Sequence, residues 1–256
     1  MWNIDDQDFV RTLTLSRPDA MNALSPQAID ELIELLDAAG RDNRVRVLVL
    51  TAEGKLFSSG MDVGALKTPE APEHVRMFNQ AVPKMFNTFI DFPKPLVMGV
   101  NGTGVGWGAT VLSHADIAIM AESARLRCPF TALGNVPEAC STAALPRLIG
   151  HQQAFWMLTS GDWYTAEQCK EIGLVLDVVP DAKLAEETQR RAKILAAYPR
   201  DALMASKRLI NGPYRDAMRK ANREEMDTFV EMLDNPACKE GLAAFLEKRP
   251  ADFSAY

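Results

Sequence analysis

The sequence predicts an α/β protein whose chain ends in a run of helices. Short segments rich in β-forming residues, each bounded by turn residues or charges, alternate with helical stretches in the first part of the chain. After about Pro180 only helical patterns occur. Because strand–helix alternation is typical of parallel pairing, we expect a parallel sheet followed by a helical region. The strand segments are residues 8–17, 45–51, 95–102 and 115–122.

The first helix is expected over residues 25–40, between the first two strand segments. Ser25 is suited to cap it and Pro26 to occupy its first position. A second helix is expected over about residues 73–89, before the third strand segment. The first helix also carries an apolar stripe at helical spacing, made of Ile29, Leu32, Ile33 and Leu36.

The C-terminal part reads as four helices separated by turn residues. The helical patterns cover residues 182–198, 202–211, 215–233 and 235–249. The residues that separate them are Pro199, Asn211-Gly212-Pro213 and Asn235-Pro236. We therefore expect an α/β core over residues 1–196 and a C-terminal helical region over residues 197–256.

The bulk properties exclude several classes of protein. The net charge of -6 predicts no general affinity for nucleic acid, so an anionic ligand would need local cations or backbone N–H groups. The sequence shows neither a signal peptide nor an apolar run of membrane-spanning length, which predicts a cytoplasmic protein. The cysteines lack metal-ligand spacing and are expected to be reduced and buried: Cys128, Cys140, Cys169 and Cys238.

Two glycine-containing loops carry the functional signal. Residues 57–62 follow the second strand segment, and residues 101–108 follow the third and open a helix. Small residues at such turns let the backbone approach a ligand and leave N–H groups free to face negative charge. Two alternatives remain. The first loop reads equally as a plain turn, and the second loosely matches a dinucleotide fingerprint, Gly104-x-Gly106-x-x-Ala109, with Glu122 downstream. The short helix and the missing second βαβαβ half count against a dehydrogenase.

Taken together, the motifs resemble the crotonase (enoyl-CoA hydratase/isomerase) family over almost the full chain. They occur in this order: Leu15-Ser16-Arg17-Pro18, Asn22-Ala23-Leu24, the loop 57–62, the strand and loop 93–108, residues 115–137, Leu145 to Gly150, Ala166 to Cys169 and Gly173-Leu174-Val175. The resemblance implies a spiral of ββα units, capped by C-terminal helices that build homotrimers, often paired into hexamers. It also implies an acyl-CoA substrate, a role in fatty acid metabolism, and no metal or cofactor beyond the substrate's coenzyme A.

The resemblance also implies an oxyanion hole made by two backbone N–H groups, those of Met61 and Trp107. Such donors stabilise the enolate oxygen of a thioester, and losing one typically costs ~3 kcal/mol. Trp107 stands where many relatives have Gly, which is compatible because the backbone makes the contact. The implied substrate-binding residues are Ser58, Ser59, Gly60, Met61, Asp62, Gly106, Trp107 and Phe130. Asp62 is also suited to brace its own turn.

The acid and base groups decide the reaction. Thr110 and Phe130 occupy the positions of the two hydratase glutamates, and neither residue can act as a base, which argues against hydration. Pro137-Glu138-Ala139-Cys140-Ser141 resembles the Pro-Glu-Gly-Cys-Ser motif of peroxisomal-type 3,2-enoyl-CoA isomerases, with Ala139 in place of Gly. Glu138 is the implied base, moving a proton from C2 to C4. Burial beside Phe130 and Trp156 would raise its pKa.

Other interpretations stay open. Glu138 would also suit a helix start, where it complements the helix dipole. A dehalogenase would carry an aspartate at position 138 and a histidine where this chain has Asn87. A hydrolase, or an acyl-CoA-binding protein without chemistry, is a further alternative. His74, His114 and His151, together with Cys140 and Ser141, are expected at the surface or in packing, and Lys67 and Arg76 are candidate cations for the coenzyme A phosphates.

Overall fold

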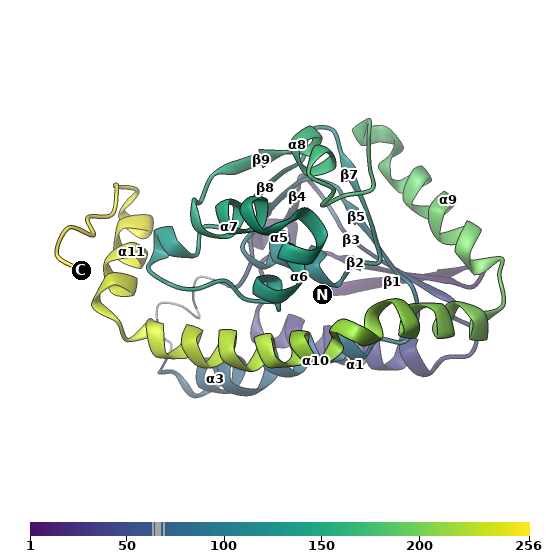
Figure 1. Cartoon of the computed structure of the whole chain (residues 1–256), viewed down its shortest axis with the longest axis horizontal. Helices are drawn as coiled ribbons and strands as arrows, with labels where there is room; N and C mark the ends of the chain where they lie inside the picture. Colours follow the sequence, from purple (N-terminus) through teal and green to yellow (C-terminus); the bar gives the residue numbers. More distant parts are fainter. Residues whose placement is uncertain (63, 65–67, 69) are drawn as a thin grey trace.

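The structure is a computed structural model that describes the whole chain except residues 63, 65–67 and 69 (Figure 1). Its core is a six-stranded sheet in the order β1-β2-β3-β5-β7-β10. These strands are β1 (Trp2–Gln7), β2 (Val10–Leu15), β3 (Val47–Ala52), β5 (Leu96–Val100), β7 (Ile117–Ala121) and β10 (Asp177–Val179). All neighbours pair in parallel except β1 and β2. The predicted parallel sheet is therefore confirmed.

A second sheet of four short strands lies beside the first, in the order β4-β6-β8-β9. Its strands are β4 (Leu56–Ser58), β6 (Thr103–Val105), β8 (Arg125–Arg127) and β9 (Trp163–Thr165). Along the chain, β3, β5 and β7 are each followed by one of its strands and then by helical turns. This repeat of long strand, short strand and helix makes the chain a spiral of ββα units.

Helices fill the connections. They are α1 (Pro26–Arg41), α3 (Pro72–Arg76), α4 (Val82–Asp91), α5 (Trp107–Thr110), α6 (Ser141–Ile149), α7 (His151–Thr159) and α8 (Ala166–Glu171). Ser25 caps α1, since its hydroxyl accepts the Ala28 N–H at 3.3 Å, as predicted. The expected helix over residues 73–89 is instead α3, a π-helical turn over Met77–Ala81, and α4. Pro83 has no N–H to donate to the carbonyl four residues earlier in the helix, which accounts for the widened turn before it.

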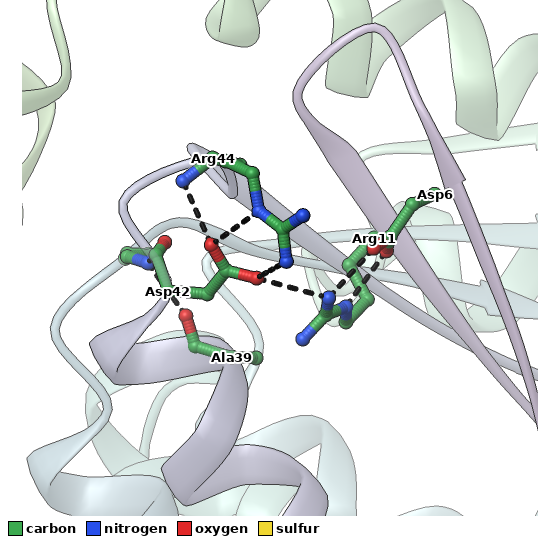
Figure 2. A network of polar contacts seen from close by, with 6 residues as sticks. Asp6, Arg11, Ala39, Asp42 and Arg44 are labelled. Carbon is green, nitrogen blue, oxygen red and sulfur yellow. Dashed lines mark hydrogen bonds and ion pairs between the residues drawn. The ribbon is translucent and has the colours of Figure 1, made fainter.

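Polar contacts tie the end of α1 to the first hairpin (Figure 2). Figure 2 shows the Asp42 carboxylate between Arg44 and Arg11, and Arg11 in turn pairs with Asp6 on β1. The buried Lys94 Nζ donates to the carbonyl of Asp42 at 2.7 Å, and burial lowers the pKa of this amine to about 8. The strand β1 itself was not predicted. Trp2 is its only buried residue, so the alternation of apolar and polar residues that marks a strand is absent.

The C-terminal part consists of α9 (Leu184–Ala196), α10 (Arg200–Leu233) and α11 (Pro236–Glu247). The expected break at residues 211–213 is wrong, because α10 continues through Pro213. Packing on both sides overrides the proline: Lys207 pairs with Asp116 at 2.7 Å, and Asn222 donates to the Pro83 carbonyl at 2.9 Å. α10 packs against α4 and α6, along the lower edge of Figure 1.

The boundary between residues 1–196 and 197–256 stays a prediction. The helix α9 packs on the six-stranded sheet through Ala192 and Ala196, which join a cluster with Val47, Val49 and Val97. Within the described residues, no helix is long and apolar enough to cross a membrane.

Candidate active site

The two glycine loops leave the short sheet side by side. β4 pairs in parallel with β6, with Leu56 opposite Thr103 and Ser58 opposite Gly104. Because parallel strands end at the same edge of a sheet, residues 59–62 and 106–108 emerge next to each other. Two segments far apart in sequence are thus brought together by the register of one strand pair.

Close backbone contact explains the glycines in these loops. Gly60 has φ +92°, and a side chain there would begin 2.8 Å from the Val105 carbonyl oxygen. At Gly108 a side chain would begin 2.4 Å from the Ser58 carbonyl oxygen. Both distances are too short for a carbon atom, so the two loops interlock only because these positions lack side chains.

Each loop presents a backbone N–H group. Leu24 takes part in a short bridge in which its own N–H donates to Gly60 and its carbonyl accepts from Asp62. Met61 lies between these two bonds, and Trp107 is the first residue of α5. Neither the Met61 N–H nor the Trp107 N–H has an acceptor among the described residues. The first atom of a side chain at Gly60, directly before Met61, would lie 3.5 Å from the Trp107 nitrogen.

Polar groups of the first loop, residues 57–62, brace the backbone. The buried Ser58 hydroxyl donates to the Asn22 carbonyl at 2.8 Å and accepts the Gly60 N–H at 3.1 Å. Asp62 accepts the Gly64 N–H at 2.9 Å, so it braces its turn as predicted. Ser59 N–H donates to the Met21 carbonyl at 3.0 Å.

A carboxyl group is tied to the same short helix. Glu138 is only 3% exposed, and its Oε1 accepts a hydrogen bond from the Thr110 hydroxyl at 2.8 Å. Thr110 is the last residue of α5, the helix that begins at Trp107. Glu138 Oε2 is buried and has no partner among the described residues. One helical turn therefore carries both the Trp107 N–H and the hydroxyl that holds the carboxyl.

The surroundings of Glu138 favour its protonated form. Burial, as the main cause, raises the pKa of its carboxyl to about 8, the Thr110 hydrogen bond opposes this, and the negative charge of Glu225 adds to it. A carboxyl with a pKa near neutral pH can both accept and return a proton. The arrangement offers two backbone N–H donors and one carboxyl group that can carry a proton.

The sequence profile of the family described as enoyl-CoA hydratase/isomerase matches residues 5–255. The chain belongs to this family, the crotonases. The structure agrees: it superimposes on the crystal structure of an enoyl-CoA hydratase/isomerase from Pseudoalteromonas atlantica with a TM-score of 0.89 and 31% identity, covering 98% of this chain and 99% of that one.

Relatives within the crotonase family differ in their reaction. The chain is 31% identical over 250 residues to 2,3-dehydroadipyl-CoA hydratase of Escherichia coli, covering 98% of this chain and 97% of that protein. It is 32% identical over 243 residues to enoyl-CoA delta isomerase 2 of Rattus norvegicus, covering 94% of this chain and 62% of that protein. The chain is thus an acyl-CoA hydratase/isomerase, and the one-turn α5 argues against the dinucleotide alternative.

The structure corrects two expectations about Glu138 in this crotonase. Glu138 lies outside any helix, since α6 starts only at Ser141. The two residues between them, Ala139 and Cys140, have φ +65° and +58° and cannot belong to a right-handed helix. The helix-dipole alternative is therefore wrong. Trp156 lies on the outer face of α7 and is 56% exposed. Its side chain therefore does not contribute to the burial of Glu138.

Other predicted residues fall as follows. Phe130 is buried, and Gly106 donates its N–H to the Arg127 carbonyl at 2.9 Å. His114 is buried and stacks against Phe89, and burial lowers its pKa to about 3, as expected of a packing residue. Arg76 pairs with Asp30, and Lys67 lies outside the described residues. Among described residues no cluster of His, Cys, Asp and Glu could hold a metal ion.

Sequence reasoning missed two residues beside Glu138. In the sequence Thr110 stands out only as a missing carboxylate, although its place one turn after Trp107 puts it on the same short helix, α5. Glu225 of α10 does not stand out in the sequence, yet it is 5% exposed and accepts the Cys140 N–H at 2.7 Å. Its spacing from the buried Ala221 and Phe229 places it on the apolar face of α10, which is the available signal.

Proposed function

We propose that this crotonase isomerises 3-enoyl-CoA to 2-enoyl-CoA, with Glu138 as its proton carrier. The observation that carries the proposal is the hydrogen bond from Thr110 to Glu138, which ties a buried carboxyl to the helix that begins with the Trp107 N–H. The acyl-CoA binds with its thioester carbonyl between the N–H groups of Met61 and Trp107. This places the reacting carbons next to the carboxyl.

The reaction then needs one carboxyl group. The Glu138 carboxylate removes a proton from C2, and the electron pair of that C–H bond moves toward the thioester oxygen, giving a dienolate. The Met61 and Trp107 N–H groups stabilise this oxygen. Glu138 returns the proton to C4 while the electrons shift, which leaves the double bond between C2 and C3. Oε2 is the oxygen that moves the proton, because Oε1 is engaged by Thr110.

The same geometry speaks against hydration. Adding water across a double bond calls for a second carboxylate to activate the water. Phe130 has no acidic group, and the Thr110 hydroxyl is engaged with Glu138. Glu225, the other buried carboxyl, accepts from Cys140 and Thr142 with its two oxygens and is directed at the backbone of α6.

We extend the proposal to the assembly and location of the enzyme. It needs no cofactor beyond the coenzyme A of its substrate, and it works in the cytoplasm as a homotrimer or hexamer. Exposed apolar side chains of the C-terminal helices support self-association, among them Leu209, Ile210 and Phe245.

The test is a panel of 3-enoyl-CoA esters of different chain lengths, followed at the ultraviolet band of the conjugated 2-enoyl thioester. The wild-type protein is expected to convert at least one of them, and Glu138→Gln to lose conversion while acyl-CoA still raises its melting temperature. Glu171→Gln, at an exposed site, is the matched control. Hydration of a 2-enoyl-CoA, thioester hydrolysis, dehalogenation, or binding without any turnover would contradict the proposal.

A further inference from the structure

A carboxylate from the C-terminal part of the chain reaches the segment that carries Glu138. Glu225 lies on α10, and its Oε2 accepts the Cys140 N–H at 2.7 Å. Its Oε1 accepts both the Thr142 N–H at 2.9 Å and the Thr142 hydroxyl at 2.6 Å. Since Glu225 is buried and makes three hydrogen bonds to two residues, α10 and the start of α6 are held in one geometry.

The held segment needs such support. Ala139 and Cys140 both lie in the left-handed region, with φ +65° and +58°, which residues with side chains rarely adopt. The Cys140 side chain does not cap α6. Without Glu225, the buried N–H group of Cys140 would be left without a partner, the N–H of Thr142 would lose its acceptor, and the two left-handed residues would lose their main restraint.

The restraint acts directly on the position of the carboxyl. The Ser141 N–H donates to the Glu138 carbonyl at 3.3 Å, inside the turn that Glu225 closes from the other side. The Glu138 side chain is fixed by Thr110 at one oxygen only. Its backbone is therefore set by α10, and its side chain by α5.

We propose that Glu225 is a positioning residue, which holds the left-handed turn at 139–140 and so directs the Glu138 carboxyl at C2 and C4 of the substrate. The inference rests on the proposed function, because it takes Glu138 as the proton carrier. It assigns a part of the catalytic geometry to the C-terminal helical region.

The charge of Glu225 adds a second effect. The two carboxyls are close enough for the charge of Glu225 to raise the pKa of Glu138. The other titratable groups that face this cluster are Cys128 after β8, Cys140 in the same segment and His114 before β7, and burial keeps all three uncharged at neutral pH. Burial raises the pKa of Glu225 itself to about 7, so Glu225 carries its charge in the pH range near 8 where Glu138 titrates, and removing that charge lowers the pKa of Glu138.

The experiment compares Glu225→Gln with the wild type in the isomerase assay. Glutamine keeps the size of the side chain, but it has only one oxygen. Its NH2 group therefore faces one of the two N–H donors, Cys140 or Thr142, and cannot accept from it. A misplaced carboxyl is expected to lower kcat by roughly 10- to 100-fold with KM within about threefold. The acid limb of the kcat–pH profile is expected to move to lower pH, which a purely structural defect does not produce. Thr142→Val removes one donor and is expected to lower kcat several-fold.

The matched control is Glu224→Gln, an exposed carboxylate on the same helix, which is expected to leave kcat unchanged. A folded Glu225→Gln protein with wild-type kcat and pH profile overturns the inference while the loss of activity in Glu138→Gln keeps the proposed function intact. If Glu225→Gln does not fold, unchanged kcat in Thr142→Val overturns the inference. Absence of isomerisation in the wild type, at every chain length, overturns the proposed function and this inference with it.

Discussion

The Thr110 hydroxyl donates a hydrogen bond of 2.8 Å to Glu138 Oε1, and no water or solvent-exposed group is needed to connect the two. The resemblance to the family implies that Thr110 stands where a hydratase would carry a glutamate. In this chain the position supplies a donor to a carboxyl instead of a carboxyl of its own.

Replacing Thr110 by valine is expected to raise the pKa of Glu138. The hydrogen bond favours the charged carboxylate and so lowers the pKa, whereas burial raises it. Without the hydrogen bond, the effect of burial is no longer partly offset. Less Glu138 is then ionised at a given pH, and the rise of kcat with pH moves to higher pH. The pH profile of isomerisation measures this. Thr88→Val is the control, because Thr88 donates to the Lys84 carbonyl on α4, away from Glu138; an equal shift in both variants would argue against the role of Thr110.

Glu138→Gln is expected to melt at a higher temperature than the wild type at alkaline pH. The pKa of Glu138 is raised to about 8 from 4.5, so the folded state holds a proton that the unfolded state releases between these values. Wild-type stability therefore falls as pH rises through this window, and the fall ends above the folded pKa. Glutamine does not titrate, so the difference in melting temperature should be small near pH 4 and largest near pH 9. A difference independent of pH would contradict this assignment.

Ala139→Gly is expected to stabilise the protein. Ala139 is held at φ +65°, where an alanine is strained by roughly 1–2 kcal/mol, more than the ~0.5–1 kcal/mol that glycine loses in flexibility. The net gain of up to about 1 kcal/mol corresponds to a melting temperature higher by a few degrees. Ala144→Gly, inside α6, is the control and is expected to lower it. Equal destabilisation in both variants would show that the turn is not strained.

Gly108→Ala is expected to abolish activity and lower stability. Its added carbon would start 2.4 Å from the Ser58 carbonyl oxygen, which forces apart the loops that carry the Met61 and Trp107 N–H groups. Gly212→Ala on α10 is the control. It meets nothing within 4 Å and is expected to stabilise the helix by up to about 1 kcal/mol. Melting curves and the isomerase assay check both, and full activity in Gly108→Ala would contradict the placement of the two amides.

The sequence was sufficient where local pattern and family resemblance coincide. The strands β3, β5 and β7 and the capped helix α1 follow from apolar runs, turn residues and Ser25-Pro26, which act over a few residues. The break expected at Pro213 failed because Lys207 and Asn222 anchor α10 on both sides, and such contacts lie far away in sequence. The strand β1 was missed because all of its residues except Trp2 are exposed, which leaves no alternating apolar pattern.

The candidate site divides in the same way. The glycine loops and Glu138 were found from motifs, whereas Glu225 meets Cys140 across 85 residues of sequence and gives no local signal beyond its place on an apolar helix face. The left-handed conformation of Ala139 was hidden because alanine rarely adopts it. Only the folded chain shows that α10 and α5 hold opposite ends of one glutamate.

The most direct measurement uses a 3-enoyl-CoA in which both hydrogens at C2 are replaced by deuterium. If Glu138 carries the hydron from C2 to C4 in its buried site, the conjugated product contains deuterium at C4, detectable by mass spectrometry or NMR, and Glu138→Gln forms no product. A product whose C4 hydrogen comes entirely from water from the earliest turnover, or unchanged conversion by Glu138→Gln, would contradict the account.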